Sequence, residues 1–167
     1  MASLSIVNER RDLDTWYRGF NDAAWAPARM MIAVVADHGD DAGRRLYEAF
    51  GARFHVGLNT ADDVDRVAVA AAALADVGLP PTLIDAATDE RWDDELRSVT
   101  LQALEPVGLD VGVPLLTIDG VAASGPVLSE IPRGEAALDL FDAVGTLAAQ
   151  SSFIRFERRR QGDLHVA

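Results

Sequence analysis

The stretch VGVPLLTIDGVAASGPVLSEIPRGEAA, residues 111–137, is the most informative part of this 167-residue chain. Two short apolar runs, LLTI and VAA, flank the pair Asp119-Gly120. Asp-Gly between two such runs is a strong signal for a β-hairpin, because a tight reversal requires the positive φ that Gly adopts readily. Pro114 precedes the first run, where a strand tolerates a residue without a backbone N–H. The stretch therefore predicts two antiparallel strands and a tight turn.

On the N-terminal side of this hairpin, most of the chain carries helical patterns. Apolar residues at spacings of three and four predict a helix over residues 15–37, which kinks or restarts at Pro27. Other helices are expected over residues 40–56, from a cap at Thr60 to Gly78, over 82–87, from Thr88 to Gly108, and after Gly134. The short apolar run Leu4–Val7 is instead expected to be a strand.

Strands at the two ends and helices between them predict an α/β chain of the α+β type. We expect residues 1–12 and 107–167 to form a sheet with a final helix, and residues 13–106 to form a large all-helical insertion.

Composition excludes several classes of function. The chain carries 27 acidic and 15 basic residues, and its net charge of −12 argues against nucleic acid or an anionic membrane as a partner. No apolar run approaches the ~20 residues of a membrane span, and no basic region precedes an apolar core at the N-terminus. We therefore expect a cytoplasmic protein. The chain has no cysteine, which excludes disulfides and thiol nucleophiles within it, and no metal-binding spacing such as HExxH is present.

The order of motifs in residues 111–137 resembles the C-terminal half of a thioredoxin fold: Gly-x-Pro, a strand, Asp-Gly, a second strand, Gly-Pro and a last helix. The full wording of that stretch resembles a narrower family, the DsbA-like mycothiol-dependent nitroreductases of actinobacteria. SLSIVNE at residues 3–9, AWAPARM at 24–30 and RFH at 53–55 resemble the same family. The resemblance implies a thioredoxin-like sheet covered by a helical subdomain, and a cis peptide bond between Val113 and Pro114.

The resemblance also implies chemistry that this chain cannot perform by itself. Such enzymes work through a Cys-x-x-Cys motif whose first thiol has a lowered pKa at a helix N-terminus. The chain opens at the place of the family's second strand, so the resemblance implies an incomplete sheet that lacks the N-terminal strand and the Cys-x-x-Cys helix. The function implied is that of a protein related to mycothiol-dependent oxidoreductases, without their redox cysteines.

Val113 and Pro114 are the first candidates for a binding site. In the fold that the stretch resembles, the backbone of the residue before the cis-proline pairs with a peptide or thiol ligand as an added strand. A purely structural turn is an equal alternative. Trp25 and His55 match family positions near the cleft between sheet and helices and near the domain junction, although a packed side chain is the commoner role for each. No cofactor is expected, apart from mycothiol or another low-molecular-weight thiol by resemblance.

Three functions remain open. The chain can be an oxidoreductase family member whose redox half lies elsewhere. It can be a cysteine-free ligand-binding or biosynthetic-pathway protein that reuses the cis-Pro cleft. It can also be a non-enzymatic subunit, because a sheet without its central strand would expose unpaired backbone groups beside Leu4–Val7 and Leu115–Ile118. We expect a homodimer to cover that gap.

Overall fold

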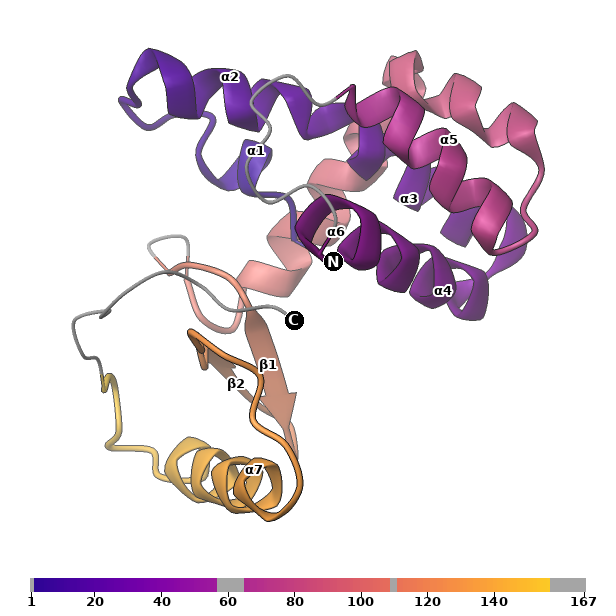
Figure 1. The fold of residues 1–167 in the computed structure, drawn as a ribbon. Helices are drawn as coiled ribbons and strands as arrows, with labels where there is room; N and C mark the ends of the chain where they lie inside the picture. The colour runs from indigo at the N-terminus through magenta and orange to yellow at the C-terminus, as the bar shows by residue number, and fades with distance from the viewer. Residues whose placement is uncertain (1, 57–64, 109–110, 157–167) are drawn as a thin grey trace. The chain divides into compact units, whose positions relative to one another are not determined.

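The computed structural model describes residues 2–56, 65–108 and 111–156, and the chain divides into two compact units, Met1–Gln102 and Ala103–Ala167 (Figure 1). The first unit contains α1 (Leu4–Val7), α2 (Thr15–Ala23), α3 (Trp25–His38), α4 (Asp40–Gly51), the π-helical turn η1 (Ala52–Val56), α5 (Arg66–Asp76), the 3-10 helices η2 (Pro81–Thr88) and η3 (Glu90–Trp92), and most of α6 (Asp93–Leu104). The second unit contains β1 (Leu115–Ile118), β2 (Val121–Ser124) and α7 (Glu135–Ala148). The described chain is thus mixed α/β and mostly helical, as the sequence predicts, whereas a thioredoxin-like sheet stays a prediction.

α3 is the central helix of the first unit. Five successive residues, from Met30 to Val34, are buried. Because successive helical residues turn by about 100°, such a run points to every side of the helix, and α3 must be packed all round. It contacts α4, α5 and η2 (Figure 1), which contribute the buried side chains of Leu46, Leu74 and Leu83 to the same core.

The prediction of a strand at Leu4–Val7 is wrong, since these residues form the single helical turn α1. Ser5 and Asn8 are both buried there and both face Asn21 of α2. The Ser5 hydroxyl donates to the Asn21 carbonyl at 2.6 Å, and Asn8 Nδ2 donates to Asn21 Oδ1 at 3.2 Å. Residues three apart share one face of a helix but point to opposite faces of a strand. The three-residue spacing of these two buried polar residues therefore fits a helix and not a strand.

Local capping explains where several helices begin. The Asp14 side chain accepts a hydrogen bond from the Tyr17 N–H at 2.7 Å and starts α2. The predicted restart near Pro27 is confirmed, because α3 begins at Trp25 and places this proline in its first turn, where no N–H is needed. The expected cap at Thr60 lies outside the described residues, and the Asp65 carboxylate caps α5 at the Val67 and Ala68 N–H groups.

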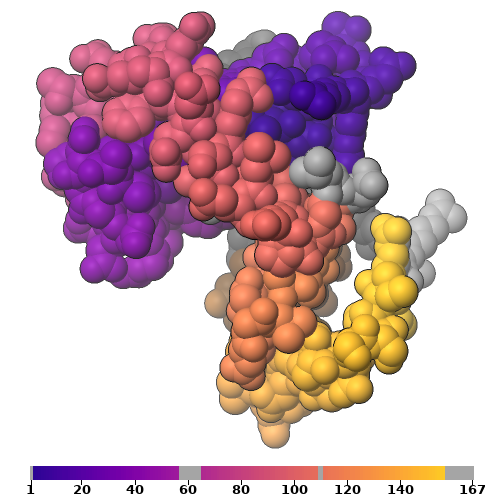
Figure 2. Space-filling view, turned by 180° about the vertical axis from the view of Figure 1, so that it is seen from behind, coloured from indigo at the N-terminus to yellow at the C-terminus, as the bar shows by residue number. Residues whose placement is uncertain are grey.

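The second unit confirms the predicted hairpin. β1 and β2 pair antiparallel, with Ile118 opposite Val121 across the turn. Asp119 and Gly120 have φ values of 49° and 81°, the two positive angles that a tight hairpin turn of this type requires. α7 contacts β2 in the same unit. Figure 2 shows the side chains of the hairpin, in orange, at the surface of this unit.

We predict that Gly43→Ala in α4 lowers the free energy of unfolding by about 1–3 kcal/mol, despite the better helix propensity of Ala. A Cβ at this position would lie 2.5 Å from Val35 Cγ2 of α3, and a Val side chain has little rotamer freedom in a helix. Urea denaturation would measure the change.

Gly19→Ala in α2 is the matched control, because a Cβ there meets nothing within 4 Å. It should stabilise the chain by about 0.5–1 kcal/mol. Equal effects of the two substitutions would show that α3 and α4 are not in close contact at this position.

Candidate functional site

The loop around Pro114 is tied to the end of the hairpin by two hydrogen bonds. The Gly125 N–H donates to the Pro114 carbonyl at 2.8 Å, and the Ser124 hydroxyl donates to the Gly112 carbonyl at 2.7 Å. The Val113–Pro114 peptide bond is cis. The loop is thus held against the last residues of β2 from both sides of Val113.

Val113 itself has unused backbone groups. Among the residues that the structure describes, none bonds to its N–H or to its carbonyl, although Gly112 and Pro114 on either side are bonded. Its side chain is half-buried and Pro114 is exposed. A free donor and a free acceptor on one residue can pair with an added strand or an amide-bearing ligand. This is the feature of the predicted site that the geometry supports best.

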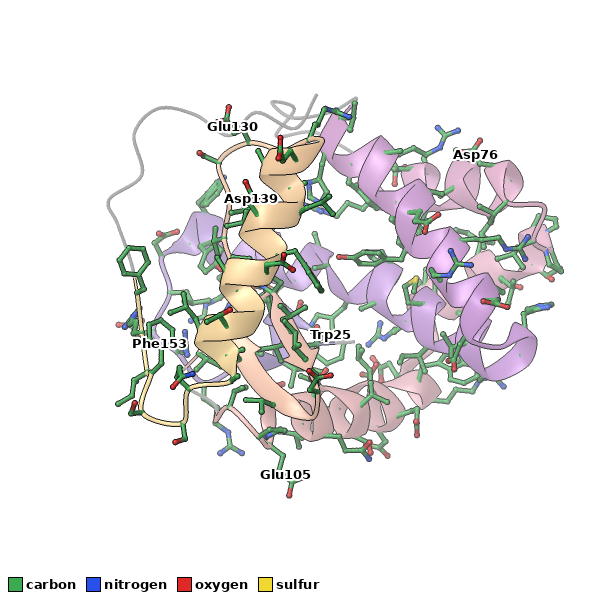
Figure 3. The ribbon with its side chains drawn as sticks, turned by 90° about the horizontal axis from the view of Figure 1, so that it is seen from below. Trp25, Asp76, Glu105, Glu130, Asp139 and Phe153 are labelled. Carbon is green, nitrogen blue, oxygen red and sulfur yellow. The ribbon has the colours of Figure 1, made fainter. Side chains whose placement is uncertain are left out.

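Trp25 opens α3 (Figure 3) and lies against two arginines. The guanidinium carbon of Arg29 is 5.4 Å from the Trp25 ring, and that of Arg97 on α6 is 5.3 Å from it. Each arginine is fixed by a carboxylate through two nitrogen atoms: Arg29 binds Asp93 at 2.6 and 2.9 Å, and Arg97 binds Glu9 at 2.7 and 2.6 Å. The ring and these pairs together join α3, α6 and the segment after α1.

The charge pairs shift the titration of their members. The hydrogen bond from Arg29 holds the pKa of the Asp93 carboxyl below its usual value, and Arg97 does the same for Glu9 by the same means. The pKa of each arginine is raised in return. Asp93 is thus a fixed anion and not a candidate proton donor near neutral pH.

His55 is exposed in the π-helical turn η1. Its imidazole makes no hydrogen bond to any residue in the described part of the chain, whereas its neighbours are engaged. Phe54 packs edge-on against Phe50 of α4, and Arg53 forms a two-point ion pair with Asp76 of α5. These contacts fix the turn and leave the His55 side chain directed to solvent.

The four predicted site residues fall in different units. Trp25 and His55 belong to the first, and Val113 and Pro114 belong to the second. Each unit is described by itself, so a common role for the four in one cleft stays a prediction. Sequence reasoning did not identify Arg29 and Asp93 as a pair. Trp25 lies four residues before Arg29, and Arg97 lies four residues after Asp93. The sequence does not show that the two helices carrying these residues meet.

The first unit also contains a cavity of about 200 Å³ between α3, η2 and η3. Asp37, Asp85 and Asp89 line it together with Trp92, whose Nε1–H is buried without an acceptor among the described residues. No three acidic or histidine side chains in the described ranges lie close enough to hold a metal ion.

Among the helices that the structure describes, none has both the length and the apolar character needed to cross a membrane.

Comparison with known proteins gives a family and a curated relative. Residues 1–159 match the family described as Rv2466c-like, mycothiol-dependent nitroreductase Rv2466c. A curated relative, the uncharacterized protein Rv2286c of Mycobacterium tuberculosis (strain ATCC 25618 / H37Rv), is 34% identical over 115 residues, which are 68% of this chain and 48% of the relative. The chain therefore matches about half the length of that relative.

We predict that Arg29→Met lowers the free energy of unfolding by about 1–2 kcal/mol near neutral pH, because it leaves the partly buried Asp93 carboxylate without its donor. Pairing lowers the pKa of Asp93 in the folded state, so its stabilisation is present above the unfolded pKa of about 3.9 and is lost as the pH falls through the folded pKa. The difference between Arg29→Met and the unchanged chain should therefore shrink below about pH 4.

Urea denaturation at several pH values would measure this difference. Arg44→Met is the control, because Arg44 forms only exposed pairs with Asp41 and Glu48 and should cost less than about 0.5 kcal/mol. An Arg29→Met effect that does not change between neutral and acidic pH would contradict the assignment to Asp93.

Proposed function

Because the chain belongs to the Rv2466c-like family of mycothiol-dependent nitroreductases, we propose that it serves in the same kind of oxidoreductase chemistry by binding the thiol ligand. The ligand is mycothiol or another low-molecular-weight thiol, free or as a disulfide. Its site is the Val113–Pro114 loop of a thioredoxin-like, DsbA-like half-sheet. The proposal places this chain in the cytoplasm, where low-molecular-weight thiols are kept reduced.

The observation that carries the proposal is the unpaired backbone of Val113. The hydrogen bonds of its two neighbours, Gly112 and Pro114, fix the loop on either side of Val113 and leave its own N–H and carbonyl available to a ligand. An amide group of a thiol ligand can pair with both groups as a short added strand. Affinity then comes from the main chain, and the side chains around it provide selectivity.

The same proposal limits the chemistry of the chain. Thiol–disulfide exchange proceeds by attack of a thiolate on a disulfide sulfur, and the 167 residues contain no cysteine. The reacting sulfur must therefore come from the ligand or from another polypeptide segment. We expect this chain to hold and orient the thiol ligand, and we do not expect it to exchange disulfides by itself.

A second candidate, a homodimeric binding subunit without activity of its own, is favoured by the apolar surface of the second unit. α7 has no buried residue, and the side chains of Leu138 and Phe141 are 67% and 61% exposed. β1 pairs with β2, and no other described strand pairs with it. Leu4–Val7 is a helical turn and therefore offers no strand edge for a partner.

We predict that mycothiol binds the chain and that Ser124→Ala weakens this binding by about fivefold, equivalent to about 1 kcal/mol. Ser124→Ala removes the hydroxyl that holds the Gly112 carbonyl and thereby loosens the loop before Val113. Isothermal titration calorimetry would measure the affinity.

Thr146→Ala is the matched control, because the Thr146 hydroxyl also donates to a backbone carbonyl of the second unit, that of Asp142 within α7. It should leave the affinity unchanged. No binding of mycothiol to the unchanged chain, or equal losses in both variants, would count against a thiol site at this loop.

We also predict a homodimer at micromolar concentration, measured by light scattering, and its dissociation in the double variant Leu138→Lys, Phe141→Lys. Burial of two large apolar side chains supplies about 1.5–3 kcal/mol each, which charged replacements remove. Asp139→Lys, at an exposed position on the same helix (Figure 3), introduces a lysine without removing apolar surface and should remain dimeric. A monomer in the unchanged chain would rule out the dimeric subunit.

A further inference from the structure

Arg66, the first residue of α5, lies beside two phenylalanine rings. Its guanidinium carbon is 4.6 Å from the ring centroid of Phe20 on α2 and 5.8 Å from that of Phe54 in η1. Phe54 in turn packs edge-on against Phe50, at a centroid distance of 5.6 Å, and Phe50 belongs to the core. Three separate elements of the first unit thus meet at this guanidinium.

Arg66 differs from the paired arginines, because no carboxylate in the described part of the chain pairs with it. Arg29, Arg53 and Arg97 each bind an acidic side chain through two nitrogen atoms, and their pKa values are raised. No described residue accepts a hydrogen bond from Arg66, and its pKa is lowered because it is partly buried. A partly buried cation with no counterion among the described residues gains free energy when an anion pairs with it.

The contact with the Phe20 ring favours one position for that anion. Aromatic rings contact the flat faces of a guanidinium, so its N–H groups remain available along the edge. Along that edge the N–H groups form a planar fork, which matches the two oxygen atoms of a carboxylate. The favoured partner is therefore planar at its charged end.

An exposed aromatic side chain lies next to Phe20. Trp16 precedes Phe20 by one helical turn on α2, and their ring centroids are 6.1 Å apart with an interplanar angle of 23°. The Trp16 side chain is 68% exposed and that of Phe20 is 39% exposed. Large aromatic side chains gathered at the surface mark binding sites more often than isolated ones do. The Trp16 ring offers a stacking surface within reach of a small molecule held by Arg66.

We propose that Arg66, Phe20 and Trp16 form a binding site for a small aromatic carboxylate. The carboxylate pairs with the edge of the Arg66 guanidinium, and the aromatic ring of the ligand stacks on the Trp16 indole. A net charge of −12 disfavours multiply charged anions, so a single negative charge on a flat apolar body suits this site better than a phosphate does. This site lies in the first unit and does not depend on the Val113 loop.

The test uses 2-naphthoate as the probe in a ¹H–¹⁵N NMR titration of the full chain, followed at the Trp16 indole N–H, which Trp16→Phe identifies. We expect a saturable shift at low salt that weakens as salt is added. Arg66→Met should reduce the affinity at least tenfold, and Arg66→Lys should reduce it less, because it keeps the charge but loses the fork. Trp16→Ala, followed at neighbouring backbone amides, should reduce it severalfold.

Arg44→Met is the matched control, since Arg44 is an exposed arginine of the same unit with carboxylate partners, and it should bind 2-naphthoate like the unchanged chain. Circular dichroism would show that every variant is folded. Three results would overturn the proposal: no saturable shift with the unchanged chain, equal affinity in Arg66→Met and Arg44→Met, or binding of inorganic phosphate as tight as that of 2-naphthoate.

Discussion

Burial of α3 on every side is the constraint on which the first unit depends. The run from Met30 to Val34 has no solvent-facing side, so α4, α5 and η2 must surround it. The same helix carries Trp25 and Arg29 at its start, one turn apart, and Arg29 reaches Asp93 at the start of α6. The apolar core thus sets the positions of the helices, and the charge pairs then fix how their ends meet. A substitution that disturbs α3 therefore affects both the apolar core and the charge pairs.

Much of the fold could be predicted from the sequence because its turns and helix starts depend on the backbone preferences of one or two neighbouring residues. Asp119-Gly120 between apolar runs gave the hairpin, and Pro27 gave the restart of a helix, each through the backbone angles that one or two residues favour. Leu4–Val7 was misread because a four-residue apolar run fits a strand or a helical turn equally well. The deciding signal was the spacing of Ser5 and Asn8, and it has meaning only once Asn21 is known to lie opposite.

The candidate sites also depend on contacts between residues that are distant in the sequence. Pro114 stands out in the sequence, but the unpaired backbone of its neighbour Val113 is visible only when Gly125 and Ser124 are seen to bond on either side of it. Arg66 carries no sequence signal at all, because its position beside two phenylalanine rings depends on where α2, η1 and α5 converge. Ion pairs and aromatic contacts between helices join residues far apart in the chain, and residue spacing does not encode them.

We propose that the chain binds a thiol ligand without exchanging disulfides, and the Val113 amide is the most direct reporter of that binding. Hydrogen–deuterium exchange at this amide would be measured by NMR with and without saturating mycothiol. The Gly125 amide, already bonded to the Pro114 carbonyl, is the internal reference. The account predicts fast exchange at Val113 in the free chain and marked slowing with mycothiol, with Gly125 unchanged. Equal exchange at Val113 in both samples would contradict it.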